Sequence, residues 1–339
     1  MIRVGVVGYG TIGKRVANAI TKQPDMVLVG VVKRSPDYSA KIGISRGIRF
    51  FIPHEELVDA WNRAGARYYG TLDDLLQECD VIVDATPKGI GMKNRVIYES
   101  KGIKAIFQGG EHPNVGEVSF VAQVNYESAL GKQFLRVVSC NTTGLARVLH
   151  AINQQYPIEK AIVFLVRRAI DPNQDTNGII DCVAPSFGVS HHAEDLKTVL
   201  KDINIVTFAV RIPVTHFHVH MISIKLKETV DRREIIDLLE ESRRIVVLSS
   251  RDGLGSTAKL LDLSRELGRP RFDIYENLVW LDSIYAEGKW LHLMQAIHQE
   301  AIVIPENIDA IRAVSGFTDA LTSMNLTDSS LSIVSTRFY

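Results

Sequence analysis

The sequence predicts an α/β fold in which a doubly wound parallel sheet is followed by an α+β region with a mostly antiparallel sheet. Up to about residue 139, short apolar strand patterns alternate with helical patterns, which is typical of a parallel sheet covered by helices on both faces. After Cys140 the candidate strands become longer, and several alternate apolar and polar residues, as in an antiparallel sheet with one covered face.

The composition limits the partners and the location that we expect. The 339 residues include 39 basic and 39 acidic ones, so the charge balance gives no reason to expect a nucleic acid partner. Three cysteines do not make a disulfide framework and suit a reducing compartment. No apolar run approaches about 18 residues, so no membrane span is expected. The first strand starts at Ile2 and leaves no room for a signal peptide, and we therefore expect a cytoplasmic protein.

Each half of the chain supplies its own set of elements. In the first half we expect strands at Ile2–Val7, Val27–Val32, Val81–Ala85, Ala105–Phe107 and Phe134–Val138, and helices at Thr11–Gln23, Leu72–Glu78 and from Cys140 to Gln155. In the second half we expect strands at Ala161–Arg167, Ile205–Ile212, Phe217–Lys225, Leu278–Ile284 and Trp290–Met294, and helices at Arg232–Ser242 and Ser256–Leu267. Pro305 is expected to open a last helix, Glu306–Val314.

A glycine-rich loop lies between the first strand and the first helix. Residues 8–13 read Gly-Tyr-Gly-Thr-Ile-Gly, and in this context the pattern is typical of dinucleotide binding. Gly8 allows the tight turn, Gly10 lets the backbone approach a pyrophosphate at the helix N-terminus, and Gly13 lets the helix pack against the strand. The alternative is a glycine-rich turn without a ligand. We favour a Rossmann-type dinucleotide-binding domain at 1–139, a catalytic domain at 140–300 and a C-terminal helical segment at 301–339 that packs back on the first domain.

The residues after the second strand bear on the choice between NAD and NADP. An acidic side chain there would bond the ribose 2′-hydroxyl. This chain has Lys33 and Arg34 instead, and these cations can hold a 2′-phosphate. Asp37 lies past Pro36, and we expect it to be out of reach. We infer that NADP is used and NAD is accepted too, with solvated surface charges at Lys33 and Arg34 as the alternative.

Cys140 lies where a strand leads into the first turn of a helix. Unpaired backbone N–H groups and the helix dipole there favour the thiolate over the thiol. Ser139 and Asn141 give it polar neighbours, whereas Cys79 and Cys182 lack such a setting and are taken as structural. Downstream of a dinucleotide loop, such a cysteine suggests covalent attack on a carbonyl followed by hydride transfer. The alternative is a small core residue.

Five of the ten histidines fall in two clusters that could serve this cysteine. His191 and His192 are adjacent, while His216, His218 and His220 alternate and would line one face of a strand. One of them could be the general base that takes the thiol proton. Alternatively, several could hold a metal, or they could form a structural or polar surface. We favour the base and expect no metal, because a metal site would explain the clustering but needs neither a glycine-rich nucleotide loop nor a cysteine at a helix start.

Other strand ends carry candidates for ligand contacts. Arg167 and Arg168 end a strand and could grip a substrate phosphate or a cofactor, or form a salt-bridged subunit contact. Gln299 follows the last strand and could bond a nicotinamide amide. Gly109 and Gly110 would let a nicotinamide ribose approach closely, unless they are an ordinary exit from the strand.

Together these segments resemble the archaeal branch of the glyceraldehyde-3-phosphate dehydrogenase family. The segments that carry the resemblance follow the family's order along nearly the whole chain: 8–16, 108–110, 139–143 (Ser-Cys-Asn-Thr-Thr), 167–168, 190–192, 218–220 (His-Val-His) and 299–307. Bacterial and eukaryotic members read Ser-Cys-Thr-Thr-Asn at the cysteine and usually place an acid where this chain has Lys33. The first departure leaves the phosphate sites open, and the second fits dual cofactor use, as in the archaeal branch.

The resemblance implies a reaction and a set of site residues. Cys140 attacks the aldehyde of D-glyceraldehyde 3-phosphate to form a thiohemiacetal, and His218 is the base, with His220 as the runner-up. Hydride transfer leaves a thioester that inorganic phosphate cleaves to 1,3-bisphosphoglycerate, a step of glycolysis and gluconeogenesis. A homotetramer is also implied. Implied cofactor contacts are Thr11, Ile12, Gly110, Arg168 and Gln299, and implied substrate or phosphate contacts are Ser139, Asn141, His192 and Ala193.

Other classes of function stay open beside this one. Another cysteine-dependent semialdehyde or acyl-phosphate reductase would share the dinucleotide loop and the cysteine. A non-catalytic nucleotide-binding sensor would need no reactive thiol. A metal-dependent hydrolase would use the histidine clusters.

Overall fold

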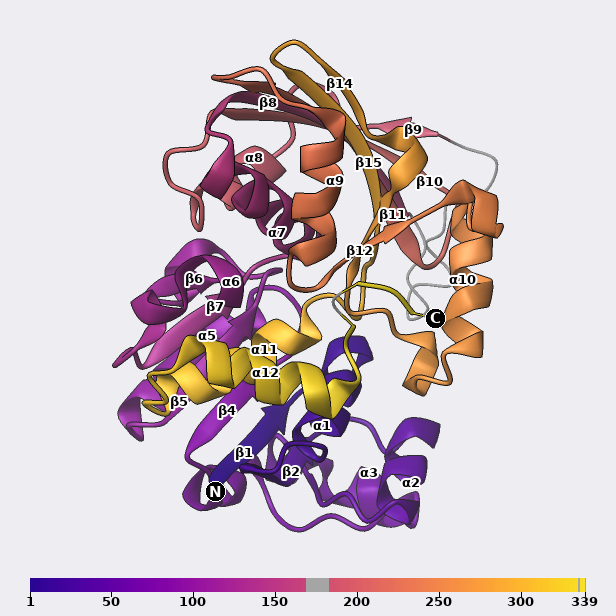
Figure 1. Cartoon of the computed structure of the whole chain (residues 1–339). Helices are drawn as coiled ribbons and strands as arrows, with labels where there is room; N and C mark the ends of the chain where they lie inside the picture. The colour runs from indigo at the N-terminus through magenta and orange to yellow at the C-terminus, as the bar shows by residue number, and fades with distance from the viewer. Residues whose placement is uncertain (169–182, 335, 339) are drawn as a thin grey trace. The chain divides into compact units, whose positions relative to one another are not determined.

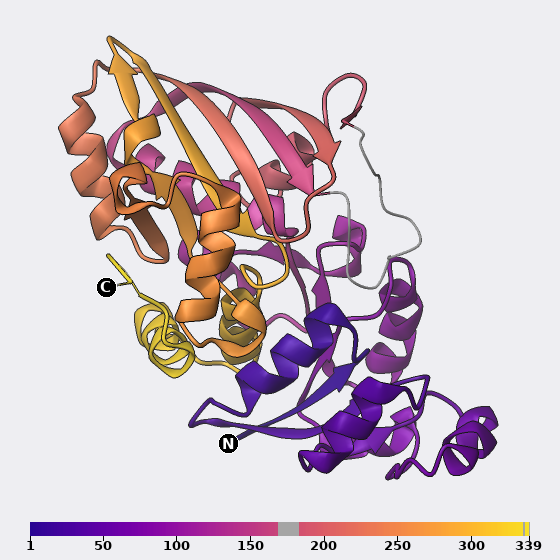
Figure 2. The same ribbon diagram turned by 90° about the vertical axis from the view of Figure 1, so that its right-hand side faces the viewer.

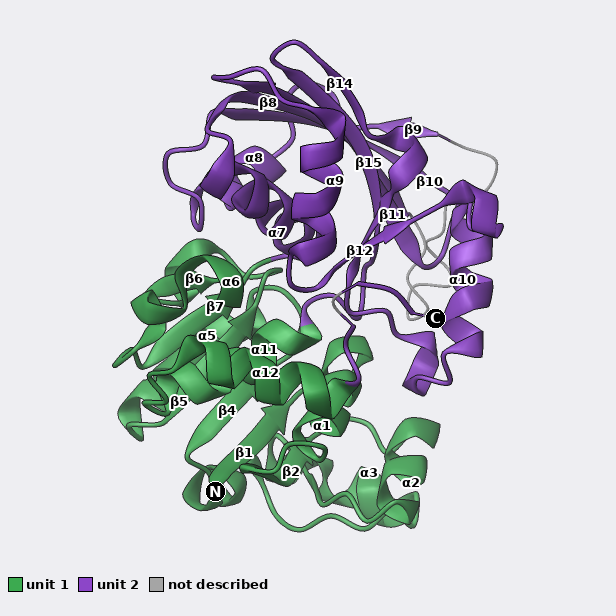
Figure 3. Ribbon diagram, viewed as in Figure 1, with its two compact units in different colours: residues 1–138, 304–331 green, residues 139–303, 332–339 purple. Residues whose placement is uncertain are grey.

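The chain divides into two compact units, which are described separately (Figures 1 and 3). The computed structural model describes residues 1–168, 183–334 and 336–338, so Cys182 lies outside the described residues. Unit 1 comprises Met1–Val138 and Ile304–Leu331, and unit 2 comprises Ser139–Val303 and Ser332–Tyr339. The last residues, from Ser332 on, thus belong to unit 2 and not to the unit that contains the dinucleotide loop.

Unit 1 is built on a seven-stranded parallel sheet with the order β3-β2-β1-β4-β5-β7-β6. Its strands are β1 (Ile2–Val7), β2 (Met26–Val32), β3 (Phe50–Phe51), β4 (Val81–Asp84), β5 (Lys104–Gln108), β6 (Val118–Phe120) and β7 (Phe134–Val137). Its helices are α1 (Thr11–Ile20), α2 (Tyr38–Ser45), α3 (Val58–Arg63), α4 (Leu72–Glu78), α5 (Ile90–Ser100), α6 (Ala122–Asn125), α11 (Ile304–Val314) and α12 (Ala320–Leu331). The order runs outward from β1 in both directions, so the predicted doubly wound parallel sheet is confirmed.

Buried polar side chains fasten α11 to the parallel sheet of unit 1. The fully buried guanidinium of Arg312 donates to both carboxylate oxygens of Asp25, each at 2.8 Å, and to the side-chain oxygen of Gln23 at 2.7 Å. Near the other end of the helix, the amides of Asn307 and Gln108 exchange hydrogen bonds of 2.8 and 3.2 Å. Because Gln108 ends β5, this pair fixes α11 beside the carboxyl edge of the sheet.

Unit 2 carries a second, mixed sheet with the order β12-β13-β15-β11-β8-β10-β9, and β14 pairs with β15. Its described strands are β8 (Ile158–Arg168), β9 (Ala184–Pro185), β10 (Ile205–Ile212), β11 (Phe217–Leu226), β12 (Ile245–Leu248), β13 (Asn277–Trp280), β14 (Tyr285–Glu287) and β15 (Trp290–His298). Its described helices are α7 (Cys140–Gln155), α8 (His192–Lys197), α9 (Arg232–Glu241) and α10 (Thr257–Glu266). Most strand pairs are antiparallel, which confirms the predicted α+β architecture, and Figure 2 shows the long strands β8, β11 and β15 side by side.

The predicted strand Leu278–Ile284 is wrong in its second half. β13 ends at Trp280, and a 3₁₀ turn follows at Leu281–Ser283. The hydroxyl of Ser283 donates to the carbonyl of Trp280 at 2.6 Å and accepts the N–H of Met294 at 2.8 Å. The serine therefore satisfies backbone groups that a continuing strand would have paired.

Helix α7 begins at Cys140, as the sequence predicts, and is anchored inside unit 2. Its apolar residues Leu145, Val148, Leu149 and Ile152 are fully buried. The buried guanidinium of Arg147 donates to the carbonyls of Tyr275 at 2.7 Å and Ile302 at 3.0 Å. The start of the helix is thereby held in place by packing on one face and by hydrogen bonds on another.

No described helix is long and apolar enough to cross a membrane.

Candidate active site

The glycine loop of unit 1 has the geometry that a dinucleotide needs. Gly8 has a φ of +96°, and a Cβ added to Gly13 would lie only 1.8 Å from the carbonyl oxygen of Gly8. A Cβ added to Gly10 would meet no atom within 4 Å, so the space beside its backbone is open. Helix α1 has no side-chain cap and no acidic residue in its first turn, which begins with Thr11 and Ile12. Its N-terminus therefore suits an anion such as a pyrophosphate.

Lys33 follows β2 at the same edge of the sheet and has an acidic partner. Its Nζ lies 3.0 Å from Oδ2 of Asp37, an ion pair that the sequence analysis did not foresee. The Asp37 carboxylate also caps α2 by accepting the N–H groups of Ser39 and Ala40. The acid and the lysine are four positions apart, in the segment that joins β2 to α2. Gly110, which comes two residues after β5, is exposed at this carboxyl edge too.

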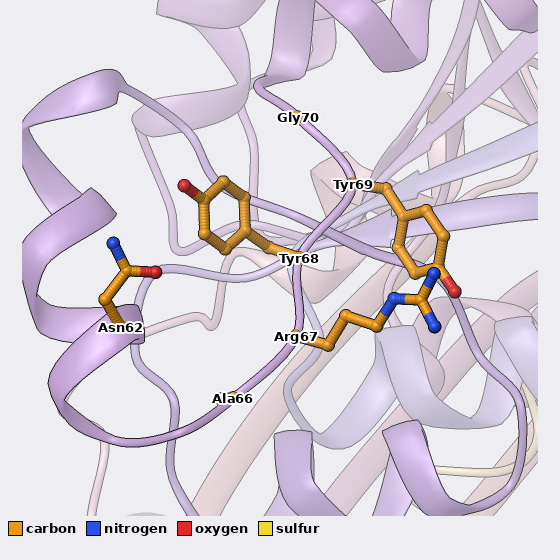
Figure 4. Close-up of a pocket in the computed structure, with 6 residues that line it drawn as sticks. All are labelled: Asn62, Ala66, Arg67, Tyr68, Tyr69 and Gly70. Atoms are coloured by element: carbon orange, nitrogen blue, oxygen red, sulfur yellow. The ribbon is translucent and has the colours of Figure 1, made fainter.

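A shallow hollow of about 550 Å³ is lined by residues from the end of α3 and the segment that follows it (Figure 4). The indole N–H of Trp61 donates to the carbonyl of Arg34 at 3.2 Å, which ties the segment after β2 to α3. Figure 4 shows the rings of Tyr68 and Tyr69 on opposite sides of the chain, and the guanidinium of Arg67 lies 4.6 Å from the centroid of the Tyr69 ring. The lining residues are Asn62, Ala66, Arg67, Tyr68, Tyr69 and Gly70, and sequence reasoning assigned a role to none of them.

Cys140 is the first residue of α7 and is partly exposed. Ser139 caps the helix, and its hydroxyl accepts the N–H of Thr142 at 3.3 Å. Burial raises the pKa of the Cys140 thiol to about 11, although the charges of Arg167 and Arg168 and the backbone N–H of Asn141 act in the opposite direction. The prediction that the helix start holds a thiolate is therefore wrong for the resting protein, because desolvation outweighs the favourable charges. The thiol must lose its proton during the reaction.

The two arginines at the end of β8 have different surroundings. Arg168 is buried, and its guanidinium contacts Glu300 at 2.9 Å, the carbonyl of Thr215 at 2.6 Å and the side-chain oxygen of Gln299. The structure thus brings together Arg168 and Gln299, both predicted as cofactor contacts. The Nε of Arg167 is buried without a hydrogen-bond partner among the described residues. Its charge lowers the pKa of Cys140, so it is a candidate for holding an anion there.

The predicted histidine face exists on β11 for His218 and His220, whereas His216 precedes the strand and is wrong as its third member. His218 and His220 are buried, whereas the next residue of the strand, Met221, is 38% exposed. The Nδ1 of His218 accepts the backbone N–H of Arg168 at 2.9 Å, so the proton of the neutral ring lies on Nε2. The Nε2 of His220 lies 2.9 Å from the side-chain oxygen of Asn141, next to Cys140 in the chain. β11 therefore contributes to the surroundings of the helix start.

His192 and Ala193 reach the same cluster from the start of α8. The Nε2 of His192 lies 3.3 Å from the amide nitrogen of Asn141, and its Nδ1 lies 3.0 Å from the hydroxyl of Ser190. The N–H of Ala193 donates to the hydroxyl of Thr207 at 3.1 Å. Four of the predicted residues, Asn141, His192, Ala193 and His220, therefore belong to one buried polar cluster.

The histidines of this cluster are held neutral. Burial lowers the pKa of His220 to about 3, and burial with the charge of Arg167 lowers the pKa of His192 to about 3. The pKa of His218 is also far below its ordinary value, because the ring is buried near His220 and the two arginines. Among the residues that the structure describes, no group of three or more His, Cys, Asp or Glu side chains is arranged to hold a metal ion.

Sequence reasoning missed several polar residues of the site. Glu300 pairs with Arg168, while Gln295 and Asn277 are fully buried beneath His220. A polar residue in an alternating strand is normally assigned to the solvent face. The sequence signal for Gln295 was the two-residue period of the strand, which puts it on the same face as the apolar Leu291, Leu293 and Ile297.

These features define a class of protein: a dinucleotide-type unit joined to a unit that presents a cysteine among neutral histidines and arginines. The family described as the C-terminal domain of glyceraldehyde 3-phosphate dehydrogenase matches residues 139–266, and the N-terminus of dihydrodipicolinate reductase matches residues 2–108. The chain belongs to the glyceraldehyde-3-phosphate dehydrogenase family.

Curated relatives from archaea support this assignment along the full chain. The glyceraldehyde-3-phosphate dehydrogenase of Hyperthermus butylicus is 49% identical over 99% of this chain and 98% of its own length. Those of Methanopyrus kandleri and Thermoplasma volcanium are 48% and 46% identical, and each alignment covers 98% of both chains. The resemblance read from the motifs is thereby confirmed.

The glycine loop generates a prediction with a built-in control. Gly13→Ala should lower the thermal midpoint of unfolding markedly, because its Cβ would lie 1.8 Å from a backbone oxygen. Gly10→Ala should fold with an unchanged midpoint, since its surroundings are open, but should bind NADP at least about tenfold more weakly, because the methyl group blocks the pyrophosphate. Calorimetry and fluorescence titration measure the two effects. Normal NADP affinity in Gly10→Ala would rule out this loop as the binding site of the pyrophosphate.

Proposed function

We propose that the protein is a phosphorylating glyceraldehyde-3-phosphate dehydrogenase that oxidises D-glyceraldehyde 3-phosphate with inorganic phosphate to 1,3-bisphosphoglycerate. The observation that carries the proposal is Cys140 at the start of α7, inside the segment that matches the family's C-terminal domain. The full-length similarity to relatives that carry this name supports the same activity.

Cys140 is the proposed nucleophile. Its sulfur forms a bond to the aldehyde carbon, and the carbonyl oxygen takes up a proton to give a thiohemiacetal. Loss of hydride from that carbon leaves a thioester on the sulfur. An oxygen of inorganic phosphate then attacks the acyl carbon, and the Cys140 sulfur leaves. The charge of Arg167, with its unpartnered Nε, supports a role in holding one of the two phosphate groups.

His218 is the proposed base for these proton transfers. Its neutral state supports the role, because an imidazolium could not accept a proton. In the resting protein its Nδ1 accepts the N–H of Arg168 and its Nε2 carries the ring proton. Accepting a proton at Nε2 therefore requires that the contact with Arg168 opens and the ring proton moves to Nδ1. His220 is the weaker candidate, since Asn141 and Gln295 occupy both of its nitrogens.

The cofactor is proposed to be NADP, with NAD accepted as well. The open backbone at Gly10 and the uncapped start of α1 fit a dinucleotide, which supplies the hydride acceptor when it is bound. Thr11, Ile12 and Gly110 are the proposed contacts in unit 1, and Arg168 and Gln299 those in unit 2. Lys33 is proposed to meet the 2′-phosphate of NADP. To bind that phosphate, Lys33 has to give up its ion pair with Asp37. This cost reduces the advantage of NADP over NAD, so it supports use of both cofactors.

The central experiment is a phosphate-dependent assay of NADP reduction with D-glyceraldehyde 3-phosphate. The parent protein should turn over only when phosphate is present. Cys140→Ser should lose turnover while binding NADP normally, because the hydroxyl is a far weaker nucleophile at neutral pH. Turnover retained in Cys140→Ser would contradict the mechanism. Turnover with another semialdehyde and none with this substrate would favour the neighbouring reductase activity.

Lys33 provides a test of the cofactor preference. Lys33→Ala should raise the KM for NADP by about tenfold, because one close ion pair with the phosphate is lost. The KM for NAD should change little. Lys41→Ala, which removes an exposed lysine from the neighbouring helix α2, is the control and should leave both values unchanged. An unaltered ratio of the two KM values in Lys33→Ala would reject the phosphate role.

A homotetramer is proposed from the family resemblance, and one face of the second sheet supports self-association. Phe164, Met221 and Met294 lie opposite one another on β8, β11 and β15 and are 48%, 38% and 41% exposed. Phe208 on β10 stacks on Phe164 with a distance of 5.3 Å between the ring centroids. Such a contiguous apolar stripe on a sheet face is typical of an interface with another chain.

Charge placed in this stripe should disrupt the assembly. Met221→Glu should reduce the mass measured by light scattering, because a carboxylate would be buried without a partner between two copies of the sheet. Val96→Glu, at a 66% exposed apolar residue of α5, is the control and should keep the parent mass. An unchanged mass in Met221→Glu would exclude this face as the interface.

A further inference from the structure

The side chain of Asn141 lies at the centre of a chain of buried hydrogen bonds directly behind Cys140. Asn141 is 2% exposed, and its two polar atoms contact two different histidines. Its Oδ1 faces the Nε2 of His220 at 2.9 Å, and its Nδ2 faces the Nε2 of His192 at 3.3 Å. The direction of each bond can be deduced from the groups at the two ends of the chain.

At the His220 end, a backbone carbonyl fixes the direction. The oxygen of Gly144 can only accept, and it lies 3.1 Å from the amide nitrogen of Gln295 and 2.7 Å from that of Asn277. The nitrogen of Gln295 must then also be the donor to Nδ1 of His220 at 3.0 Å. The ring proton of His220 consequently lies on Nε2 and is donated to Asn141.

At the His192 end, a second carbonyl closes the chain. Because the oxygen of Asn141 accepts from His220, its nitrogen donates to Nε2 of His192. The Nδ1 of His192 then carries the ring proton and donates to the hydroxyl of Ser190 at 3.0 Å. That hydroxyl lies 2.7 Å from the hydroxyl of Thr207, which donates to the carbonyl of Ser190 at 3.0 Å. Every member therefore has one role, and both rings have to be neutral.

We propose that Asn141 is a positioning residue, which holds the first turn of α7 and with it the Cys140 sulfur through this one-directional chain between His220 and His192. The proposal rests on Cys140 as the nucleophile of the proposed function. Asn141 acts on that nucleophile through the backbone, since its own N–H is one of the groups that stabilise the Cys140 thiolate. Its carboxamide accepts from one neutral ring through the oxygen and donates to the other through the nitrogen, which a carboxylate cannot do.

Asn141→Asp tests the proposal with almost no change in shape. The carboxylate can still accept from His220 but has no hydrogen to donate to His192, so His192 must take up a proton or turn away. We expect kcat to fall about 10–100-fold, because small displacements of a reacting group have effects of this size. The pH profile of kcat should gain a new ionisation, which belongs to the introduced carboxylate and the His192 ring that faces it.

A second measurement is the rate at which iodoacetamide alkylates Cys140. It needs no substrate, so it does not depend on the proposed reaction. In Asn141→Asp the rate at pH 8 should fall about tenfold or more, because the thiolate loses a fixed N–H donor and gains a nearby negative charge. Asn153→Asp is the matched control on the same helix. Asn153 is exposed, and its Oδ1 accepts the N–H of Ile158 at 2.8 Å, which a carboxylate can do as well.

Two variants of His220 test the proposal if Asn141→Asp does not fold. His220→Gln keeps a donor that can reach Asn141, and His220→Leu does not, so the glutamine variant should retain most of the alkylation rate and the leucine variant should lose it. Parent-like alkylation, kcat and pH profile in Asn141→Asp, or equal rates in the two His220 variants, would overturn the proposal. A normal aldehyde reaction is not needed for the alkylation result, so failure of the proposed function would be recognised separately.

Discussion

The start of helix α7 is enclosed by buried groups, and the chemistry available to Cys140 depends on this enclosure. Removal from water raises the pKa of the thiol to about 11 and lowers the pKa of His192 and His220 to about 3. Both effects have the same cause, the cost of placing a charge where water cannot solvate it. The resting site is therefore uncharged at the sulfur and at the imidazoles, and the nucleophile is generated when the reaction begins rather than stored beforehand.

Two buried arginines that are fully engaged in hydrogen bonds or an ion pair hold the elements around Cys140 in place. Arg147 binds two backbone carbonyls and fixes α7, while Arg168 binds Glu300 and the carbonyl of Thr215 and fixes the end of β8. Removing Glu300 would leave the buried charge of Arg168 without its carboxylate, which is strongly unfavourable. Arg167 differs, because its buried Nε has no hydrogen-bond partner among the described residues. A cation kept in this state beside a cysteine is well suited to an anionic ligand.

Features that depend on local sequence could be predicted, and features that depend on distant side chains could not. The loop at Gly8 and Gly13 follows from steric demands that only glycine meets, and the inward face of β11 follows from the two-residue period of a strand. The bond between Lys33 and Asp37 escaped prediction because it depends on the course of an irregular segment between β2 and α2. The contact of Asn141 with His192 joins residues 51 positions apart, and nothing in the local pattern encodes it.

For Cys140 the sequence predicts the position correctly but predicts the wrong direction for the shift of its pKa. The sequence places the thiol at a helix start, where the backbone favours a thiolate. The sequence does not show how far the second sheet and its histidines exclude water from that position. Since the desolvation effect is the larger one, the structure reverses the sign of the predicted shift.

The pH dependence of Cys140 alkylation tests the neutral resting site most directly. Iodoacetamide reacts with the thiolate, so a thiol with a pKa of about 11 should react faster with each step from about pH 6 to about pH 9.5, without levelling off. Cys140→Ser measures the contribution of the other cysteines, of which Cys79 is buried, and burial raises its pKa to about 12. A rate that becomes constant near about pH 6 or 7 would show a preformed thiolate and would contradict this account.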